Sequence, residues 1–136
     1  MADYTSSARP EWYNKFRDKI KTVEIEEGVT AIGAYTFQKH GNLKQIDLPN
    51  TLQKIGSSAF ASCTALTEIE LPASVTSVES YAFYGTGLEK ITFLSKTTKI
   101  KDATQTISES ATIYGYAGST AEAYANKYGR TFEVLK

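Results

Sequence analysis

A unit of 23 residues repeats along the middle of the chain, and this repeat restricts the possible folds more than any other feature. The pair Ile32-Gly33 returns as Ile55-Gly56 and, in altered form, as Val78-Glu79. Three more columns keep the period: Thr36-Phe37, Ala59-Phe60 and Ala82-Phe83; Val29, Leu52 and Val75; and Leu43, Leu66 and Leu88, the last after a one-residue deletion around Gly85 to Gly87. Self-similarity at this period is typical of solenoids.

Each unit opens with a short alternating run of apolar and polar residues, which predicts a strand with one buried face. The four runs are Val23-Glu24-Ile25, Ile46-Asp47-Leu48, Ile69-Glu70-Leu71 and Ile91-Thr92-Phe93. A unit of this kind cannot bury its own apolar edge, so neighbouring copies must stack. We therefore expect Phe37, Phe60 and Phe83 to form one continuous column in the core. Because Val78-Glu79 replaces Ile-Gly, we expect that this corner needs no positive φ.

The strand spacing Leu43-x-x-Ile46-x-Leu48 is the L-x-x-L-x-L pattern of leucine-rich repeats. Over about residues 20–95 the sequence resembles the BspA-like, bacterial surface-antigen type of these repeats. The unit of that family looks like I-x-L-P-x-x-V-x-x-I-G-x-x-A-F-x-x-C-x-x-L-x-x, and Ile46 to Glu68 matches it most closely. The resemblance implies an α/β solenoid, a short right-handed superhelix with a parallel concave sheet, and turns with brief helical segments on the convex side.

We expect a single leucine-rich-repeat domain over residues 1–136. Residues 1–22 form an N-terminal helical cap, residues 23–93 form three repeats plus a closing strand, and residues 94–136 form a degenerate repeat and a C-terminal cap. The stretch Leu94 to Ser110 lacks the Gly-x-x-Ala-Phe segment and is interpreted as the degenerate fourth turn.

Local sequence patterns predict the secondary structure of both caps. At the front, Trp12, Phe16 and Ile20 fall at i, i+4 and i+8 of a helix with Pro10 near its first turn, and this stripe is expected to seal the first repeat. At the back we expect a strand at Thr112–Tyr116, a helix that begins at the capping box Ser119-Thr120-Ala121-Glu122 and ends at Gly129, and a closing helix/strand cap completed by Thr131–Leu135.

The amino-acid composition excludes several classes of protein. The 136 residues contain 15 Lys plus Arg and 15 Asp plus Glu, so no basic excess is present for nucleic acid or anionic lipid. The single Cys allows neither an internal disulfide nor a structural zinc site. The sequence contains no run of about 18 apolar residues, so no membrane-spanning helix is predicted. The opening MADYTSSARP lacks the regions of a signal peptide, and Met1 fits either a natural start or a start placed after a removed export signal.

The main binding candidates are outward positions on the strands. Side-chain alternation places Glu24, Asp47, Glu70 and Thr92 in one row and Gln45, Glu68 and Lys90 beside it. One interpretation is a docking surface for a partner carrying Lys or Arg, or a weak cation site. The other is a solvated sheet face whose lysines relieve the repulsion between the carboxylates.

A second binding candidate is a set of tyrosines whose exposure the sequence leaves open. They suit protein or sugar binding if they are exposed, and they shield the convex edge and the cap if they are buried. They are Tyr35, Tyr81, Tyr84, Tyr114 and Tyr116.

His40 and Cys63 share one repeat position, which Thr86 occupies in the third copy. A Cys near a His suggests a nucleophile and its base, but no orienting acid or oxyanion site follows at a recognisable spacing. The resemblance implies a small buried Cys here. The glycines belong to repeat turns and form no phosphate loop. We therefore expect no catalytic residues, no bound metal and no cofactor.

The resemblance implies a non-catalytic adhesion or binding module of a secreted or cell-surface bacterial protein, commonly one part of a longer chain. Its partners are expected to be proteins or glycans of a host, a neighbouring cell or the cell wall. We expect a monomer that neither binds nucleic acid nor inserts into a membrane. Two alternatives remain open: a structural spacer that holds another domain away from the envelope, and a Cys-dependent enzyme built on the solenoid.

Overall fold

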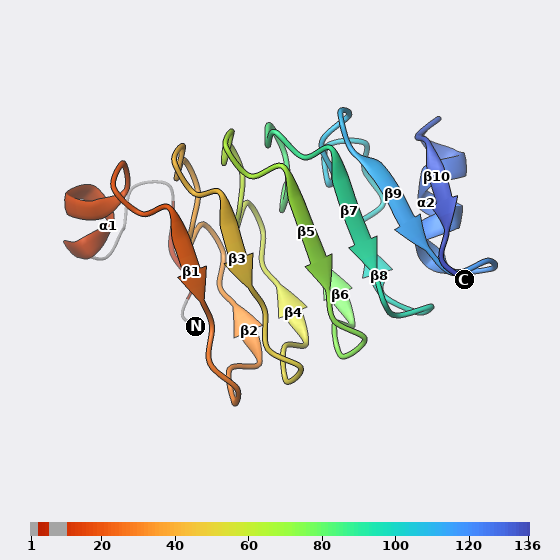
Figure 1. Cartoon of the computed structure of the whole chain (residues 1–136), viewed down its shortest axis with the longest axis horizontal. Coiled ribbons are helices and arrows are strands. Elements are labelled where there is room, and N and C mark those ends of the chain that lie inside the picture. Colours follow the sequence, from red (N-terminus) through yellow and green to blue (C-terminus); the bar gives the residue numbers. More distant parts are fainter. Residues whose placement is uncertain (1–2, 6–10) are drawn as a thin grey trace.

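The computed structural model describes residues 3–5 and 11–136, which form a stack of about five turns (Figure 1). The turns contribute strands to a front row, in the order β1 (Thr22–Glu24), β3 (Gln45–Asp47), β5 (Glu68–Leu71), β7 (Lys90–Phe93), β9 (Thr112–Gly115) and β10 (Phe132–Val134). A rear row contains β2 (Ala31–Ile32), β4 (Lys54–Ile55), β6 (Ser77–Val78) and β8 (Lys99–Ile100). The α/β solenoid expected from the sequence is therefore confirmed.

The rear row is a sheet, which stands beside the expected turns and replaces the brief helical segments expected on that side. Its four strands pair in parallel in the order β2-β4-β6-β8. Ile32 pairs with Ile55, Ile55 with Val78, and Val78 with Ile100. Each strand has only two residues, which is too few for an alternating pattern to show in the sequence.

The phenylalanine column is continuous, as the repeat predicts. The rings of Phe37 and Phe60 stack at 5.5 Å between centroids, and those of Phe60 and Phe83 stack at 5.4 Å with planes 1° apart. In the degenerate stretch Ile107 bridges to Phe83 in parallel and is 1% exposed, so it continues the column. Residues 94–110 thus form a fourth turn of the stack, and β9 and β10 extend the front row beyond it.

Two positions in each repeat adopt a positive φ, and neither is the Gly of the Ile-Gly pair. They are Tyr35, Ser58 and Tyr81, and then Lys39, Ser62 and Gly85. A non-glycine residue in this region costs roughly 1–3 kcal/mol, which the surrounding structure must offset. Hydrogen bonds between neighbouring turns, such as Tyr35 N to Ser57 O and Ser58 N to Ser80 O, hold these residues in place. The expectation that the Ile-Gly corner needs no positive φ is confirmed.

The N-terminal cap differs from the predicted stripe. Helix α1 (Glu11–Phe16) ends after six residues, so a stripe at i, i+4 and i+8 cannot reach Ile20. Tyr13 is the buried residue of the helix at 3% exposure, whereas Phe16 is 40% exposed. Trp12 and Ile20 do pack against the core, Ile20 from the chain that follows the helix. Pro10 lies outside the described residues.

The C-terminal cap follows the sequence signals closely. Helix α2 (Thr120–Lys127) has Ser119 as its N-cap, whose hydroxyl accepts the N–H of Glu122 at 3.2 Å. The Glu122 carboxylate accepts the N–H of Gly118 at 2.6 Å, and Gly129 ends the helix region with φ +64°. Strand β10 then pairs with β9 in parallel. Within the described ranges, neither helix has the length and apolar character that crossing a bilayer requires.

Removing the central ring of the column should destabilise the fold strongly. Phe60 is 0% exposed and stacks on both neighbours. Phe60→Ala should lower the free energy of unfolding by about 3–5 kcal/mol, because a cavity forms where no side chain can collapse. Urea denaturation of Phe60→Ala and of the half-exposed control Phe16→Ala tests this. Similar losses in the two variants would contradict the column's role.

Gly56 is required by close approach between turns. A Cβ on Gly56 would lie 2.6 Å from the backbone nitrogen of Ala34, whereas a Cβ on Gly41 would meet only the Thr64 hydroxyl at 3.8 Å. Gly56→Ala should therefore lower stability by roughly 1–3 kcal/mol through overpacking, and Gly41→Ala should not. Thermal unfolding of the two alanine variants checks the difference, and equal melting temperatures would refute it.

Candidate binding surface

The outward side chains of the front strands form the surface that the sequence singles out. Glu24, Asp47 and Glu70 are exposed, as predicted. Glu24 on β1 lies in register with Asp47 on β3. The alternation of burial along β3 and β5 shows why: Ile46 and Ile69 point into the core, so their neighbours in sequence point out.

The front row is broken between β3 and β5. Among the strands of the described residues, β3 pairs only with β1, and β5 belongs to a separate sheet of four strands. The rear ladder is continuous across the same turns, because β4 pairs with β6. The break leaves a groove of about 420 Å³ lined by Lys44, Gln45, Ile46, Asp47, Glu68, Ile69 and Glu70. Four of the predicted site residues therefore come together here, while Glu24 lies one strand away.

The carboxylates of the groove take part in none of the salt bridges of the described residues. The two salt bridges of the described residues, Arg17–Asp18 and Lys127–Asp102, lie elsewhere. Within the groove, the Gln45 amide donates to Asp47 Oδ1 at 3.2 Å. Three carboxylates thus face one ammonium group, which is a net negative surface on a chain of zero net charge. This arrangement can attract a partner that presents Lys or Arg side chains.

Lys90 and Thr92 are less available than predicted. The Lys90 ammonium lies 4.6 Å from the centroid of the Tyr114 ring, which holds it over β9 by a cation–π contact. Thr92 lies in register with Glu70 on the outward face, as predicted, but it is only 5% exposed, so it is not available to a partner. The register explains this, because Thr92 lies between Glu70 and Tyr114, whose larger side chains flank it. The sequence predicts the strand that carries Tyr114 but not its register with β7.

The cation-site interpretation finds no support in the geometry. Among residues 3–5 and 11–136, no group of three or more His, Cys, Asp or Glu side chains is arranged to hold a metal ion. The acidic residues of the front row are instead spread along three strands.

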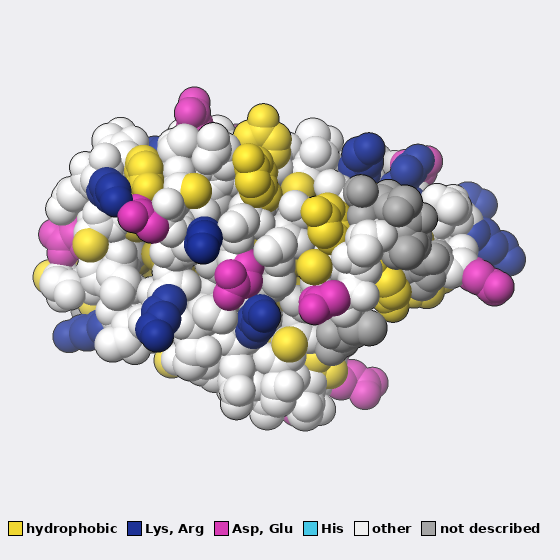
Figure 2. Space-filling view, turned by 180° about the vertical axis from the view of Figure 1, so that it is seen from behind, with side chains coloured by type: hydrophobic (Ala, Val, Ile, Leu, Met, Phe, Trp, Pro, Cys, Tyr) yellow, Lys and Arg dark blue, Asp and Glu magenta, His cyan; other side chains and the backbone are white. Residues whose placement is uncertain are grey.

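The tyrosines divide into two groups. Tyr35, Tyr114 and Tyr116 are half-buried, as the shielding interpretation predicts. Tyr81 and Tyr84 are 46% and 49% exposed, so shielding does not describe them. On the rear of the molecule, hydrophobic side chains emerge as separate groups among charged ones (Figure 2). Tyr81 and Tyr84 are therefore candidates for contact with a partner.

His40 and Cys63 have structural surroundings. The imidazole of His40 packs against three aromatic rings and so joins the N-terminal cap to the core. The distances between ring centroids are 5.7 Å to Trp12, 5.2 Å to Tyr13 and 5.6 Å to Phe37. Cys63 is 0% exposed, and its thiol donates to Phe37 O at 3.0 Å. Burial raises the pKa of this thiol from 9.0 to about 12, against the opposing effect of a backbone hydrogen bond with His40. A buried thiol of this pKa is a poor nucleophile.

The raised pKa of Cys63 should appear in the pH dependence of stability. Between pH 9.0 and about 12 the unfolded chain loses the thiol proton and the folded chain keeps it, so stability falls as pH rises. The wild type should lose up to about 1.4 kcal/mol per pH unit more than Cys63→Ala in this window. Denaturation of both proteins from pH 8 upward measures the slope. Rapid labelling of native Cys63 by a thiol reagent at pH 8 would contradict its burial.

Residues 13–111 match the family model of the BspA type leucine-rich repeat region, in six copies. The chain belongs to this family. Among solved structures, this BspA-type module is similar to a leucine-rich repeat protein from Eubacterium ventriosum ATCC 27560, with 26% identity and a TM-score of 0.63 over 86% of this chain. It also shares the fold of the pneumococcal vaccine antigen PcpA, with 18% identity and a TM-score of 0.57 over 95% of this chain. It spans 38% of each of these two chains. No curated protein matches the sequence. A module of this family fits a binding or structural role.

Proposed function

We propose that this BspA-type module is a non-catalytic binding part of a secreted or cell-surface bacterial protein, and that its front face recognises a protein partner rich in Lys or Arg. The observation that carries the proposal is the acidic groove between β3 and β5, where Asp47, Glu68 and Glu70 lie together without a salt bridge. Glu24 extends the acidic surface onto β1. A set of carboxylates held on neighbouring strands favours specific docking over general attraction.

The proposed location of the module at the cell surface is supported by its family and by its structural similarity to one solved protein. The repeat is of the bacterial surface-antigen type, and one structural neighbour is a vaccine antigen. Because the chain spans only 38% of either neighbour, we place the module within a longer protein. The large hydrophobic side chains exposed in the described ranges are few, which fits a monomer. They are Phe16, Tyr81, Tyr84 and Val134.

A structural spacer is the second candidate, and one observation favours it. Strands β1 and β10 lie at opposite ends of the stack, so neighbouring domains joined there would be held apart (Figure 1). A spacer would tolerate any exchange of front-face side chains. A Cys-dependent enzyme has no comparable support, because Cys63 is buried and its pKa is high.

Reversing the charge of the groove and its neighbour should weaken binding strongly. The triple variant Glu24→Lys, Asp47→Lys and Glu70→Lys should bind a Lys-rich extended peptide at least about tenfold more weakly, since each lost ion pair contributes up to about 1 kcal/mol and repulsion replaces it. Fluorescence anisotropy at low and high salt, with the same comparison on an array of extracellular proteins, measures the effect.

The matched control changes three carboxylates away from the groove by the same total charge: Glu11→Lys, Glu79→Lys and Glu133→Lys. It should bind within about twofold of the wild type at physiological salt, because distant surface charges are screened. Equal losses in the two triple variants would show attraction by net charge alone. Binding that survives the front-face variant would place the site elsewhere, and no binding to any probe would favour the spacer.

A further inference from the structure

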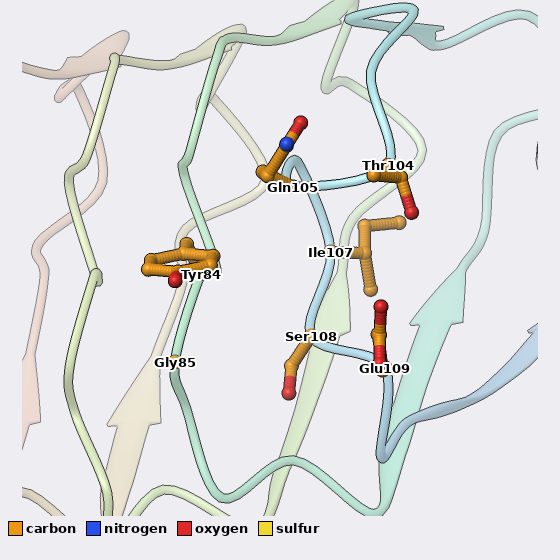
Figure 3. A pocket seen from close by; sticks show the side chains of 7 residues that line it. All are labelled: Tyr84, Gly85, Thr104, Gln105, Ile107, Ser108 and Glu109. Atoms are coloured by element: carbon orange, nitrogen blue, oxygen red, sulfur yellow. The ribbon is translucent and has the colours of Figure 1, made fainter.

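A second cavity, distinct from the acidic groove, lies between the third and fourth turns. Its volume is about 430 Å³, and one wall is formed by Tyr84 and Gly85 and the other by residues 104–109 (Figure 3). Figure 3 shows Gln105 at one end of the opening and the side chains of Ser108 and Glu109 at the other. The volume falls within the ~300–1,000 Å³ of small-molecule sites.

The cavity exists because the link between turns stops at this point. In the earlier turns, Lys39 N donates to Ala61 O and Ser62 N donates to Tyr84 O, each at 2.8 Å. Gly85 is next in this series, and in the described part of the chain its N–H has no acceptor. One backbone link between the two turns is therefore missing between the bond from Phe83 N to Thr106 O and the bond from the Ser108 hydroxyl to Thr86 O. The wall of the cavity thus contains a backbone donor that has no acceptor among the described residues.

The C-terminal cap holds the far wall in place. Arg130 Nη1 donates to Ile107 O at 3.0 Å and to Ser108 O at 2.9 Å, and Arg130 Nη2 donates to Thr104 O at 2.7 Å. The Tyr124 hydroxyl donates to Ala103 O at 2.8 Å. The wall is therefore ordered before any ligand arrives, which lowers the entropic cost of binding.

The groups still available at the cavity form a specific set. Tyr84 is 49% exposed, and its ring meets Tyr81 edge-on at 5.5 Å and 81°, which fixes its orientation. Gln105 and Glu109 are exposed, and Glu109 takes no part in a salt bridge of the described residues. The hydroxyl of Ser108 already donates to Thr86 O at 3.1 Å. An aromatic face, a backbone N–H, a side-chain amide and a carboxylate acceptor remain.

We propose that this cavity binds a neutral sugar ring at the end of a glycan. The C–H face of a pyranose packs on the Tyr84 ring, and its hydroxyls accept from Gly85 N–H and donate to Glu109, with Gln105 able to do either. Glu109 disfavours sugars that carry a carboxylate, since like charges repel at close range. This site is independent of the front-face function, because none of its residues lies on the front strands.

The test uses the whole chain with defined probes. These are methyl glycosides of neutral hexoses and N-acetylhexosamines, titrated by saturation-transfer NMR, and an array of neutral and sialylated glycans. At least one neutral probe should bind with a millimolar or lower Kd. Tyr84→Ala should weaken binding about tenfold, Tyr84→Phe should keep it, and Glu109→Gln should weaken it about threefold while reducing discrimination against sialylated glycans. Glu89→Gln, an exposed carboxylate outside the cavity, is the matched control and should bind as the wild type.

The outcomes separate this site from the front face. The front-face triple-Lys variant should keep full glycan binding, and Tyr84→Ala should keep binding of the Lys-rich peptide. Because Tyr84 is half-exposed, circular dichroism should show Tyr84→Ala folded with an unchanged melting temperature. No binding of any neutral probe, tighter binding of sialylated glycans, or equal binding by Tyr84→Ala would overturn the proposal. So would a peptide that occupies the cavity in preference to every sugar.

Discussion

Stacking between neighbouring turns is the interaction on which everything else depends. Phe60 has its ring between those of Phe37 and Phe83, and no turn alone supplies the opposite half of this contact. The strained backbone at residues such as Ser58 is held by bonds from the next turn. Stability is therefore a sum of contacts between nearest neighbours, and the outermost turns need covers. Trp12 packs at one end and Tyr124 at the other.

The sequence is most informative where the repeat constrains each residue. It predicts the front strands, the phenylalanine column and the helix that begins at Ser119, because periodicity and capping are local or regular signals. It does not predict the rear sheet, since a pair such as Ala31-Ile32 is too short to show a period. It also assigns Phe16 to the seal instead of Tyr13, because the pattern alone does not show that α1 ends after six residues.

The candidate sites depend on departures from the repeat, which are harder to read. The carboxylates of the front face follow from alternation, but the break beside them does not, since the spacing from Ile46 to Ile69 is 23 residues, the same as that from Val23 to Ile46, where the strands do pair. Thr92 is buried by Tyr114 from a strand whose register the pattern leaves open. The cavity beside Tyr84 requires Arg130 to hold a distant loop, which is a tertiary effect.

The break between β3 and β5 has a mechanical consequence. Hydrogen bonds between turns run along the axis of the stack, so tension applied at its two ends loads them one interface after another. At the β1–β3 and β5–β7 interfaces both rows resist, and beyond β7 the front row alone does, but at this interface the rear pairing of β4 with β6 bears the load on the strand rows. Bending that opens the front face is therefore easiest at this interface, with the rear ladder as the hinge. A ligand that contacted both sides of the groove would stiffen the stack of turns. Tension along the stack would in turn weaken the binding of that ligand.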